Sequence, residues 1–308
     1  METTHVSVMK DEVLAALMIK PGSVAVDGTL GLAGHGKAMA EQAAPGGLFI
    51  GFDWDQQMLA RAEEKLSAIS DVEVRLFHAD YRELPERVRE VCRETGRQPY
   101  ADAIFLDLGL NNAQIEDTER GISFRNEGPL DMRMDRSQGE PASALLNRIG
   151  PAELEQILWD FGDERWARRI AKVVVERRKS QPLKTTADLV DCVMAAIPAA
   201  KRDQRLHPAT RTFQAIRIYL NGELDGLEEC LIEIGQVLIE EGVLVVLSYH
   251  SGEDRAVKQA FKFLADTNDF DNLTRKPILP SEAEVVANGK ARSAKMRVLK
   301  RKHITENT

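Results

Sequence analysis

Three aspartates in the first third of the chain stand at the ends of short apolar runs, where a carboxylate can meet a ligand. Asp27 closes the run 23–27 and precedes a glycine-rich loop at 28–36, Asp53 closes the run 48–53, and Asp107 follows the run that begins at 103. Glycines let backbone N–H groups approach a ligand closely, and an acid about 20 residues after such a turn can accept both hydroxyls of a ribose. The pattern predicts a nucleoside-cofactor site, although each acid could instead cap a helix.

A fourth strand end carries Asp80 and Tyr81, after the apolar run 72–77. These two side chains could contact the edge and the face of an adenine. The glycine loop does not have the spacing of the dinucleotide motif GxGxxG. These residues alone leave S-adenosylmethionine and NAD both open as the cofactor.

The segment 107–135, DLGLNNAQIEDTERGISFRNEGPLDMRMD, is too polar and too aperiodic for a core strand or an amphipathic helix. Long irregular segments in compact domains are usually functional loops or linkers. Apolar side chains spread along it predict an ordered loop, either a ligand-binding loop or a linker packed on a second domain. The predicted anchors are Ile122, Phe124, Leu130, Met132 and Met134.

The order of the predicted elements indicates a parallel α/β sheet. Apolar runs at 23–27, 48–53, 72–77, 103–108 and 243–249 are strand candidates, and helical periodicity separates the first four. We predict two parts of a sheet domain at 1–112 and 207–308, and an inserted helical domain at 113–206. An apolar stripe from Phe213 to Leu238 predicts one long helix, weakened at Gly222 and Gly226. The stripe is either a core face or a seam between two copies of the chain.

Composition favours a cytoplasmic protein. The 308 residues carry a net charge of −8, with no secretory signal and no apolar run long enough to span a bilayer. The three cysteines are far apart, which indicates buried thiols, and the six histidines lack metal-ligand spacing, so no metal site is predicted. Three basic runs, at 165–179, 201–217 and 289–303, are either solvated faces or a phosphate-binding surface.

Several motifs together identify a family. The segment 107–135 resembles the signature of the bacterial 16S rRNA cytosine-N4 methyltransferases, and HPATRTFQAIRIYLNGEL (207–224), SYHSGEDRAVK (248–258) and ARSAKMR (291–297) resemble further motifs of that family, in the same order. The resemblance implies a Rossmann-like class I fold with an inserted helical domain, with S-adenosylmethionine as the cofactor. It also implies that the substrate is the cytosine at the ribosomal P site, in the 16S rRNA of the small subunit.

The resemblance also implies the site residues. Asp107 is the candidate for orienting the cytosine amine, and Asn111 and Asn112 are candidates for contacting the base. The implied cofactor contacts are Ala33, Gly34, His35, Asp53, Tyr81, Asp107 and Gln114. The implied substrate contacts are Arg133, His207, Arg211, Arg217, His250 and Arg255.

The chain departs from the family pattern at a few positions. Ala33 stands in place of a glycine, Asn111-Asn112-Ala113 in place of Ser-Ser-Pro, Tyr249 in place of a phenylalanine and Gly252 in place of a leucine. Two other hypotheses therefore stay open. One is a methyltransferase acting on another RNA or DNA base, and the other is a non-catalytic ribosome-assembly or nucleotide-binding factor.

Overall fold

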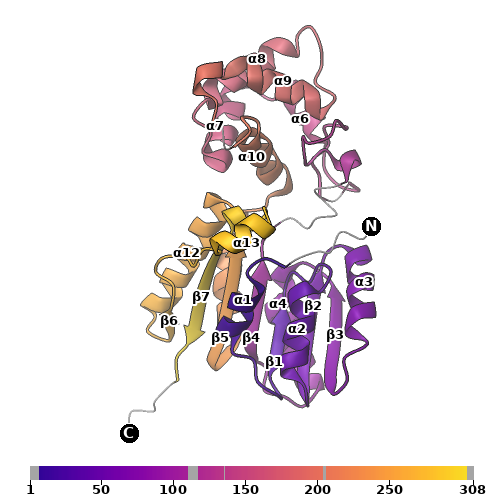
Figure 1. Ribbon diagram of the computed structural model, residues 1–308, viewed down its shortest axis with the longest axis vertical. Coiled ribbons are helices and arrows are strands. Elements are labelled where there is room, and N and C mark those ends of the chain that lie inside the picture. Colours follow the sequence, from indigo (N-terminus) through magenta and orange to yellow (C-terminus); the bar gives the residue numbers. More distant parts are fainter. Residues whose placement is uncertain (1–6, 110–116, 135, 204–205, 304–308) are drawn as a thin grey trace. The chain divides into compact units, whose positions relative to one another are not determined.

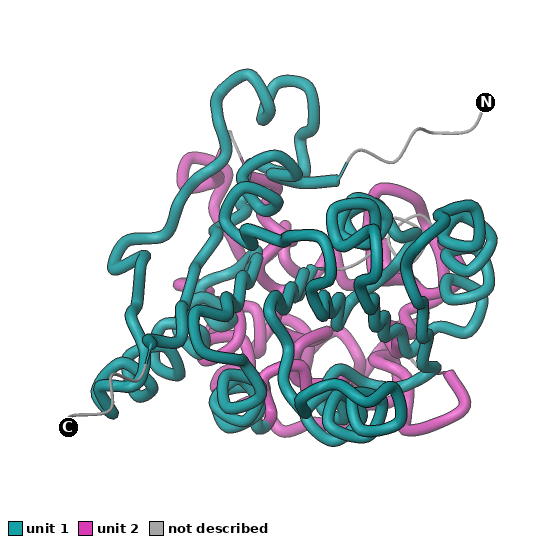
Figure 2. Tube along the Cα trace, turned by 90° about the horizontal axis from the view of Figure 1, so that it is seen from below, with its two compact units in different colours: residues 1–109, 226–308 teal, residues 110–225 magenta. Residues whose placement is uncertain are grey.

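The computed structural model describes residues 7–109, 117–134, 136–203 and 206–303, and it divides into two compact units (Figures 1 and 2). Unit 1 combines residues 1–109 with 226–308, and unit 2 is residues 110–225. The second boundary differs from the predicted one at 206. The reason is packing, because the helix after residue 206 buries Phe213 and Ile216 in the core of unit 2.

Unit 1 is built on a seven-stranded sheet with the order β3-β2-β1-β4-β5-β7-β6. Five strands are parallel and match the predicted runs: β1 (Val24–Asp27), β2 (Gly47–Asp53), β3 (Val72–His78), β4 (Ala101–Asp107) and β5 (Leu238–Ser248). In register, Val26 of β1 pairs with Ile50 of β2 and with Ile104 of β4. The parallel sheet predicted from the sequence is confirmed.

Two further strands are not predicted by the sequence pattern, namely β6 (Phe270–Asn272) and β7 (Lys295–Arg301), which pair antiparallel. β7 also pairs antiparallel with β5. Lysines and arginines alternate with apolar residues in β7, and Met296 and Val298 are buried in the core. In the sequence this stretch has the composition of a basic surface run, because its charges hide the period-two apolar pattern.

Helices cover both faces of the sheet (Figure 1). One face packs against α1 (Lys10–Leu17), α2 (Gly34–Ala43) and α3 (Gln56–Leu66), whose apolar residues share a buried cluster with β1, β2, β4, β5 and β7. The other helices of the described part of unit 1 include α4 (Leu84–Glu94), α11 (Leu227–Gln236) and α12 (Ser251–Asp266), and α11 contacts both α4 and α12. A short helix, α13 (Glu282–Ala287), and three-residue 3-10 turns at η1 (Tyr81–Glu83) and η4 (Ala291–Ser293) complete these elements.

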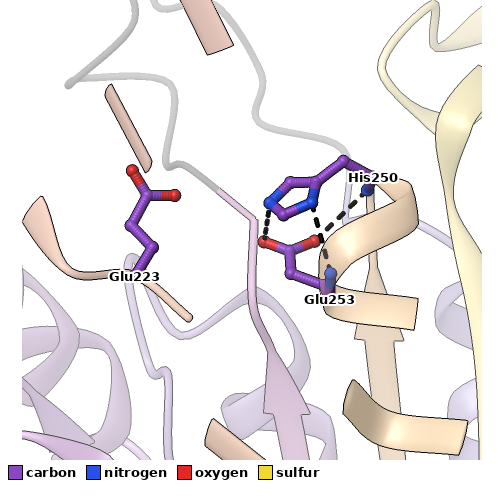
Figure 3. A group of neighbouring side chains, drawn as sticks. All are labelled: Glu223, His250 and Glu253. Carbon is purple, nitrogen blue, oxygen red and sulfur yellow. Dashed lines mark hydrogen bonds and ion pairs between the residues drawn. The ribbon is translucent and has the colours of Figure 1, made fainter. Parts of the chain in front are cut away.

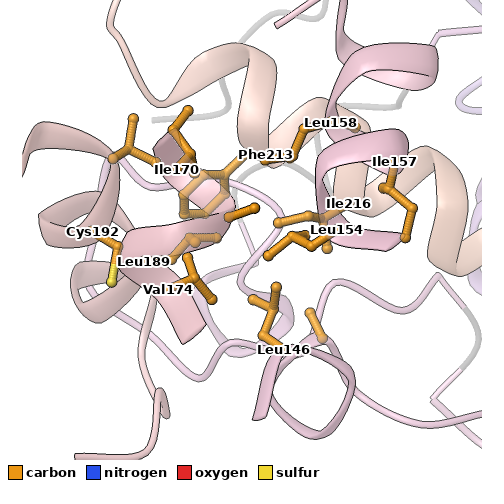
Figure 4. Packing of buried hydrophobic residues seen from close by; sticks show 14 of the residues in the cluster. Leu146, Leu154, Ile157, Leu158, Ile170, Val174, Leu189, Cys192, Phe213 and Ile216 are labelled. Carbon is orange, nitrogen blue, oxygen red and sulfur yellow. The ribbon is translucent and has the colours of Figure 1, made fainter. Parts of the chain in front are cut away.

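Unit 2 is helical, as the apolar periodicity predicted, and has its own core (Figure 4). Its described elements are η2 (Thr118–Arg120), α6 (Ala142–Arg148), α7 (Pro151–Gly162), α8 (Ala167–Arg177), α9 (Thr186–Ala196), η3 (Ala199–Lys201) and α10 (Thr210–Asn221). Thr185 and Asp188 form a capping box at the start of α9. Leu154, Leu158 and Phe213 bring α7 and α10 together in this core.

The apolar stripe from Phe213 to Leu238 is not one helix. Gly222 and Gly226 both have positive φ, of 58° and 64°, and they separate α10 from α11. Phe213 lies in the core of unit 2, and Leu231 is fully buried in unit 1. The stripe therefore serves two intramolecular cores rather than a seam between two copies.

Two smaller expectations can also be compared with the structure. Cys92, Cys192 and Cys230 are buried and free, as predicted. Among the described residues, no helix is both long enough and apolar enough to cross a bilayer.

Candidate functional site

The sheet has a topological switch point between β1 and β4. β1 is followed in sequence by its neighbour β2, whereas β4 lies on the other side of β1 and leads outward to β5. In open α/β sheets, ligands bind beyond the carboxyl ends of the strands at such a point. Asp27 and Asp107 are the last residues of β1 and β4. The predicted strand-end acids therefore flank the position at which this topology places a ligand.

The glycine loop after β1 is tied to β2 through Asp53. Oδ2 of Asp53 accepts the backbone N–H of Gly31 at 2.7 Å, and Oδ1 accepts that of Asp55 at 2.8 Å. Each oxygen retains a lone pair, because a carboxylate has about four acceptor positions. Gly31 has φ +53°, and a Cβ at this position would approach only the Thr29 carbonyl, at 4.0 Å. The loop thus leaves open space beside a fixed carboxylate.

Asp107 is held by the same loop. Its backbone N–H donates to Oγ1 of Thr29 at 2.6 Å, and its Oδ1 accepts the N–H of Gly109 at 3.2 Å. The Tyr249 ring packs on the backbone at Gly109, and its hydroxyl is placed beside the Asp107 carboxyl as a donor that lowers the pKa of that carboxyl. Burial raises the pKa of Asp107 above its usual value, while nearby His35 and the two hydrogen bonds to the carboxyl oppose this rise. This carboxyl group is desolvated and fixed in position.

Asp27 is the most deeply buried of the three acids. Burial raises its pKa from 3.8 to about 7, the hydrogen bond from the Thr29 N–H opposes the rise, and the charges of Asp107 and Asp53 add to it. Burial raises the pKa of Asp53 in the same direction. Three carboxyl groups at one strand edge therefore form a site that favours a cation, because a positive charge would relieve their mutual repulsion.

The other predicted cofactor contacts in unit 1 lie around this edge. Ala33 has φ 56° and precedes α2, so its backbone adopts the left-handed conformation that favours the family's glycine. Nε2 of the buried His35 lies 3.0 Å from the Val8 carbonyl oxygen, and its ring packs 4.5 Å from that of Phe105. Gly34 opens α2, where the first N–H groups of a helix lack intrahelical acceptors. Ala33 and Gly34 have little or no side chain, and the His35 ring is already packed, so these three residues can contact a ligand mainly through their backbone atoms.

Tyr81 begins the turn that follows β3. The Asp80 carboxylate caps this turn by accepting the Arg82 N–H at 2.9 Å, and the Arg82 guanidinium lies 5.4 Å from the centre of the Tyr81 ring. Burial raises the pKa of Tyr81, so its phenol stays neutral. A neutral, partly buried ring at this edge has the character that stacking on a purine requires.

Residues after β5 were predicted as substrate contacts, and the structure gives two of them different surroundings (Figure 3). His250 is buried and caps α12. Its Nδ1 accepts the Glu253 N–H at 3.2 Å, and its Nε2 lies 3.0 Å from Glu253 Oε1. Arg255 is exposed on α12. His250 is thus engaged in local structure, whereas Arg255 faces solvent. Figure 3 also shows Glu223, whose carboxylate pairs within unit 2 with Arg217 at 2.8 Å.

The described part of the signature segment, residues 117–134, forms an ordered loop in unit 2. The N–H of Thr186 donates to the Gly128 carbonyl at 2.9 Å, and the Asn221 side chain bonds to both Met132 and Met134. Leu130 and Met132 are buried in the helical core. The anchoring predicted from the apolar residues is therefore confirmed for this part of the segment.

Two of the arginines of unit 2 that were predicted to contact the substrate form ion pairs with acids of the same unit. Arg133 forms a two-point ion pair with Asp131, at 2.7 and 2.9 Å, and also donates to three backbone carbonyls of residues 136–139. Arg217 forms a second two-point pair with Glu223, both distances being 2.8 Å. These two arginines organise loops. Their pairing lowers the charge that they can present to a phosphate.

His207 and Arg211 flank the start of α10. Nδ1 of His207 accepts the Ala209 N–H at 3.2 Å, and its ring lies 4.7 Å from that of Phe124. Arg211 donates weakly to the Asp163 carbonyl, at 3.4 Å. His207 is exposed, so a solvent-accessible imidazole and a weakly hydrogen-bonded guanidinium both lie near the start of α10. Asn111, Asn112 and Gln114 lie outside the described residues.

The third basic run, 289–303, is largely neutralised within unit 1. Asp254 binds Lys295 at 3.2 Å and Arg297 at 2.7 Å, and Arg301 donates to backbone carbonyls of residues 236 and 238. The hypothesis of a phosphate-binding surface is therefore weaker for this run than its sequence indicated.

Two site residues are not among the candidates that the sequence indicated. Thr29 links the glycine loop to Asp107, and Tyr249 contacts Asp107 from the end of β5. Thr29 lies inside the glycine loop, so its place in the sequence could have identified it as a site residue. Tyr249 stands out in the sequence only as a departure from the family pattern, because its contact with Asp107 depends on the pairing of β4 with β5.

The strand order, the antiparallel β7 and the acidic strand edge define the class of protein. Unit 1 has the Rossmann-like fold of class I S-adenosylmethionine-dependent methyltransferases, and a helical unit follows β4. Residues 2–302 match the model of the MraW methylase family, so the chain belongs to that family.

Similar proteins extend over nearly the whole chain. The chain is 43% identical to a ribosomal RNA small subunit methyltransferase H from Geobacter sp. (strain M21), covering 96% of this chain and 98% of the relative. It is 42% identical to the protein of that name from Heliobacterium mobile, covering 97% and 99%. A solved rRNA methylase from Streptococcus thermophilus is 11% identical, covers 96% of this chain and 94% of its own, and has a TM-score of 0.40.

The protein is an S-adenosylmethionine-dependent methyltransferase, and the strand edge suits that cofactor. Asp53 keeps free lone pairs for hydroxyl groups, the space at Gly31 is open, and three carboxyl groups favour a cation such as a sulfonium. When bound, the cofactor would supply an electrophilic methyl group. The residues present therefore fit the cofactor on charge, space and hydrogen-bonding capacity.

Proposed function

We propose that this protein transfers a methyl group from S-adenosylmethionine to N4 of the P-site cytosine in the 16S rRNA of the small ribosomal subunit. Family membership and relatives named as small-subunit rRNA methyltransferases support the class of substrate. The observation that carries the reaction is the desolvated, fixed Asp107 carboxyl at the switch point, beside the glycine loop. A cytoplasmic location is part of this proposal, since the substrate is a ribosomal subunit.

The cofactor contacts follow from the strand edge. Asp53 accepts the ribose hydroxyls, and Tyr81 stacks on the adenine. Ala33, Gly34 and His35 contribute backbone atoms at the start of α2, where a helix N-terminus favours a carboxylate such as that of the methionine portion. Asp107 completes the proposed set together with Gln114, which lies outside the described residues.

Asp107 supplies orientation to the substrate. The cytosine amine is a weak nucleophile, because its lone pair is delocalised into the ring. An ionised Asp107 accepts a hydrogen bond from this amine and turns the lone pair towards the methyl carbon. The new N–C bond forms as the C–S bond breaks, the bonding pair stays on sulfur, and the amine then releases a proton to water. The carboxylate also stabilises the positive charge that develops on nitrogen.

Direct RNA contacts are assigned to His207, Arg211 and Arg255, because the first and last are exposed and Arg211 is held only weakly. Arg133 and Arg217 support the loops of unit 2, since their guanidinium groups are ion-paired locally, and His250 supports the start of α12 through its Nδ1. Asn111 and Asn112 are the proposed contacts to the edge of the base. That base must be unpaired or flipped from its stack to be reached.

The test uses small ribosomal subunits from a strain that lacks this modification, together with cofactor carrying a labelled methyl group. We expect label on N4 of the P-site cytosine. Label on another base would assign a different nucleic-acid substrate. Tight cofactor binding without any transfer to ribosomal RNA would instead favour a non-catalytic assembly factor.

The Asp107→Asn variant tests the mechanism. The amide keeps the size of the side chain but loses its charge, so we expect turnover to fall about 100-fold or more, in the range seen when one electrostatic partner of a transition state is removed. Turnover is compared at saturating cofactor, because calorimetry should also show weaker cofactor binding once one carboxylate of the acidic edge is lost. Near-normal turnover would remove Asp107 from the proposed role.

A further inference from the structure

Tyr249 comes directly after β5 and lies against the end of β4, within unit 1. A Cβ added to Gly109 would lie 2.5 Å from Cε2 of the Tyr249 ring and 2.7 Å from its Cδ2. Real Cβ atoms do not approach other atoms so closely, so only glycine leaves room for the ring here. The tyrosine ring therefore packs directly on the backbone that follows Asp107.

The tyrosine is fixed at both of its ends. Its backbone N–H donates to Glu253 Oε2 at 2.7 Å, and its hydroxyl lies beside the Asp107 carboxyl, where it acts as a donor that lowers the pKa of that carboxyl. Burial raises the pKa of Tyr249 well above 10, and the charge of Asp107 adds to the rise. The phenol therefore stays protonated and acts as the donor to the carboxyl oxygen.

Among the residues that the structure describes, the Asp107 carboxyl has only a weak donor besides the phenol. Its Oδ1 accepts the Gly109 N–H at 3.2 Å, a longer bond than the 2.7 Å bond from Gly31 to Asp53. Its backbone is fixed through Thr29, but this bond does not set the side-chain torsions. The phenol is thus the side chain that orients the carboxyl group.

We propose that Tyr249 is a positioning residue for methyl transfer, whose hydroxyl holds the Asp107 carboxyl in its ionised, correctly turned form. This inference rests on the proposed role of Asp107. At this position the resembled motif has phenylalanine, whereas this chain has tyrosine. Phenylalanine cannot donate a hydrogen bond, so only the tyrosine can act in this way.

The hydroxyl acts among other charged groups that surround Asp107. These are His35 on α2, Asp27 at the end of β1, and Glu253 on α12. His35 favours the ionised form of Asp107, whereas Asp27 and Glu253 oppose it. Removal of the phenol leaves these groups in place and takes away one hydrogen bond to the carboxylate. Asp107 should then hold its proton to higher pH.

The Tyr249→Phe variant isolates this hydroxyl. We expect kcat to fall about tenfold at neutral pH, as for the loss of one hydrogen bond to a charged group. The acidic limb of the kcat profile should move upward by on the order of one pH unit. The KM for S-adenosylmethionine should stay within about twofold, which a general loss of structure would not allow.

The matched control is Tyr100→Phe, the same change just before the opposite end of β4. Its kcat profile should overlay that of the parent. A direct readout without turnover is the titration of the Asp107 carboxyl carbon by NMR in the unliganded protein, where the Tyr249→Phe variant should show the higher pKa.

An unchanged Asp107 titration together with an unchanged kcat profile would overturn the inference. So would an equal loss of activity at every pH that parallels a loss of thermal stability. These outcomes are distinct from failure of the proposed function, which would appear in the parent protein as label on a different base or as no label. The NMR titration decides the inference in either case.

Discussion

At the residue scale, the site is a set of carboxyl groups whose burial carries an energetic cost. Asp27, Asp53 and Asp107 all have a raised pKa, and burial is the largest cause for each. Their hydrogen bonds come mostly from backbone N–H groups, which hold the acids without neutralising them. Such a site lowers stability in the free protein and gains from binding a cation. This is a common arrangement at functional sites.

Asp27 makes this cost measurable. Its pKa rises from 3.8, the ordinary value of a solvated aspartate, to about 7 in the folded protein, so the folded form binds the extra proton between these values. Stability linked to this group is present below about pH 4 and is lost as the pH rises to about 7. Between pH 5 and pH 8, the parent should lose about 2–3 kcal/mol more unfolding free energy than the Asp27→Asn variant, at about 1.36 kcal/mol per pKa unit.

The measurement is denaturant unfolding of both unliganded proteins at several pH values. Asp53 and Asp107 are present in both proteins, and their charges affect Asp27 less than burial does, so their contributions largely cancel in the difference. Parallel curves for parent and variant would show that Asp27 does not titrate in this range.

At the element scale, the loop at 117–134 depends on glycine at close backbone crossings. Gly121 has φ +60°, and a Cβ there would lie 1.9 Å from the Pro129 carbonyl oxygen. Gly128 is equally restricted, because its Cβ would lie 2.1 Å from the Thr118 oxygen. Two segments of the loop thus pass one another without room for a side chain. This packing explains how a polar, aperiodic stretch keeps one conformation.

Gly121→Ala should therefore destabilise unit 2 by more than backbone strain alone. We expect a loss of about 3 kcal/mol or more, against roughly 1 kcal/mol for a left-handed alanine without a clash. Gly139→Ala is the control, because Gly139 has φ +67° and nothing within 4 Å of the added Cβ. Chemical unfolding of the two variants measures the difference. Equal losses would show that the crossing relaxes at little cost.

At the scale of the whole molecule, each unit has a buried cluster made of its own described residues. One joins residues of α1, α2, α3 and the sheet in unit 1, and the other joins α6 to α10 in unit 2. Each core is formed by residues of a single unit. The helical unit is therefore expected to respond to a core mutation by itself.

Leu158→Ala tests this separation. Leu158 is fully buried in the core of unit 2, so the truncation should cost about 2–5 kcal/mol. Hydrogen exchange should show faster exchange in α7 and α10, while the amides of β4 and β5 keep their protection. A uniform loss of protection across both units would contradict independent cores.

The five parallel strands, the strand-end acids, the helical character of the insertion and the anchors of its loop were all predictable from the amino-acid sequence. These features depend on local periodicity, on turn residues and on the rule that ligands meet the carboxyl ends of strands. Three-dimensional packing set which unit each half of the Phe213–Leu238 stripe joins, because two glycines and distant packing partners fix that boundary. It also decided that Arg133 and Arg217 are paired and that Tyr249 reaches Asp107. The two ion pairs are local but depend on the loop conformations that the fold sets, whereas Tyr249 and Asp107 are far apart in the chain and meet only because β4 pairs with β5.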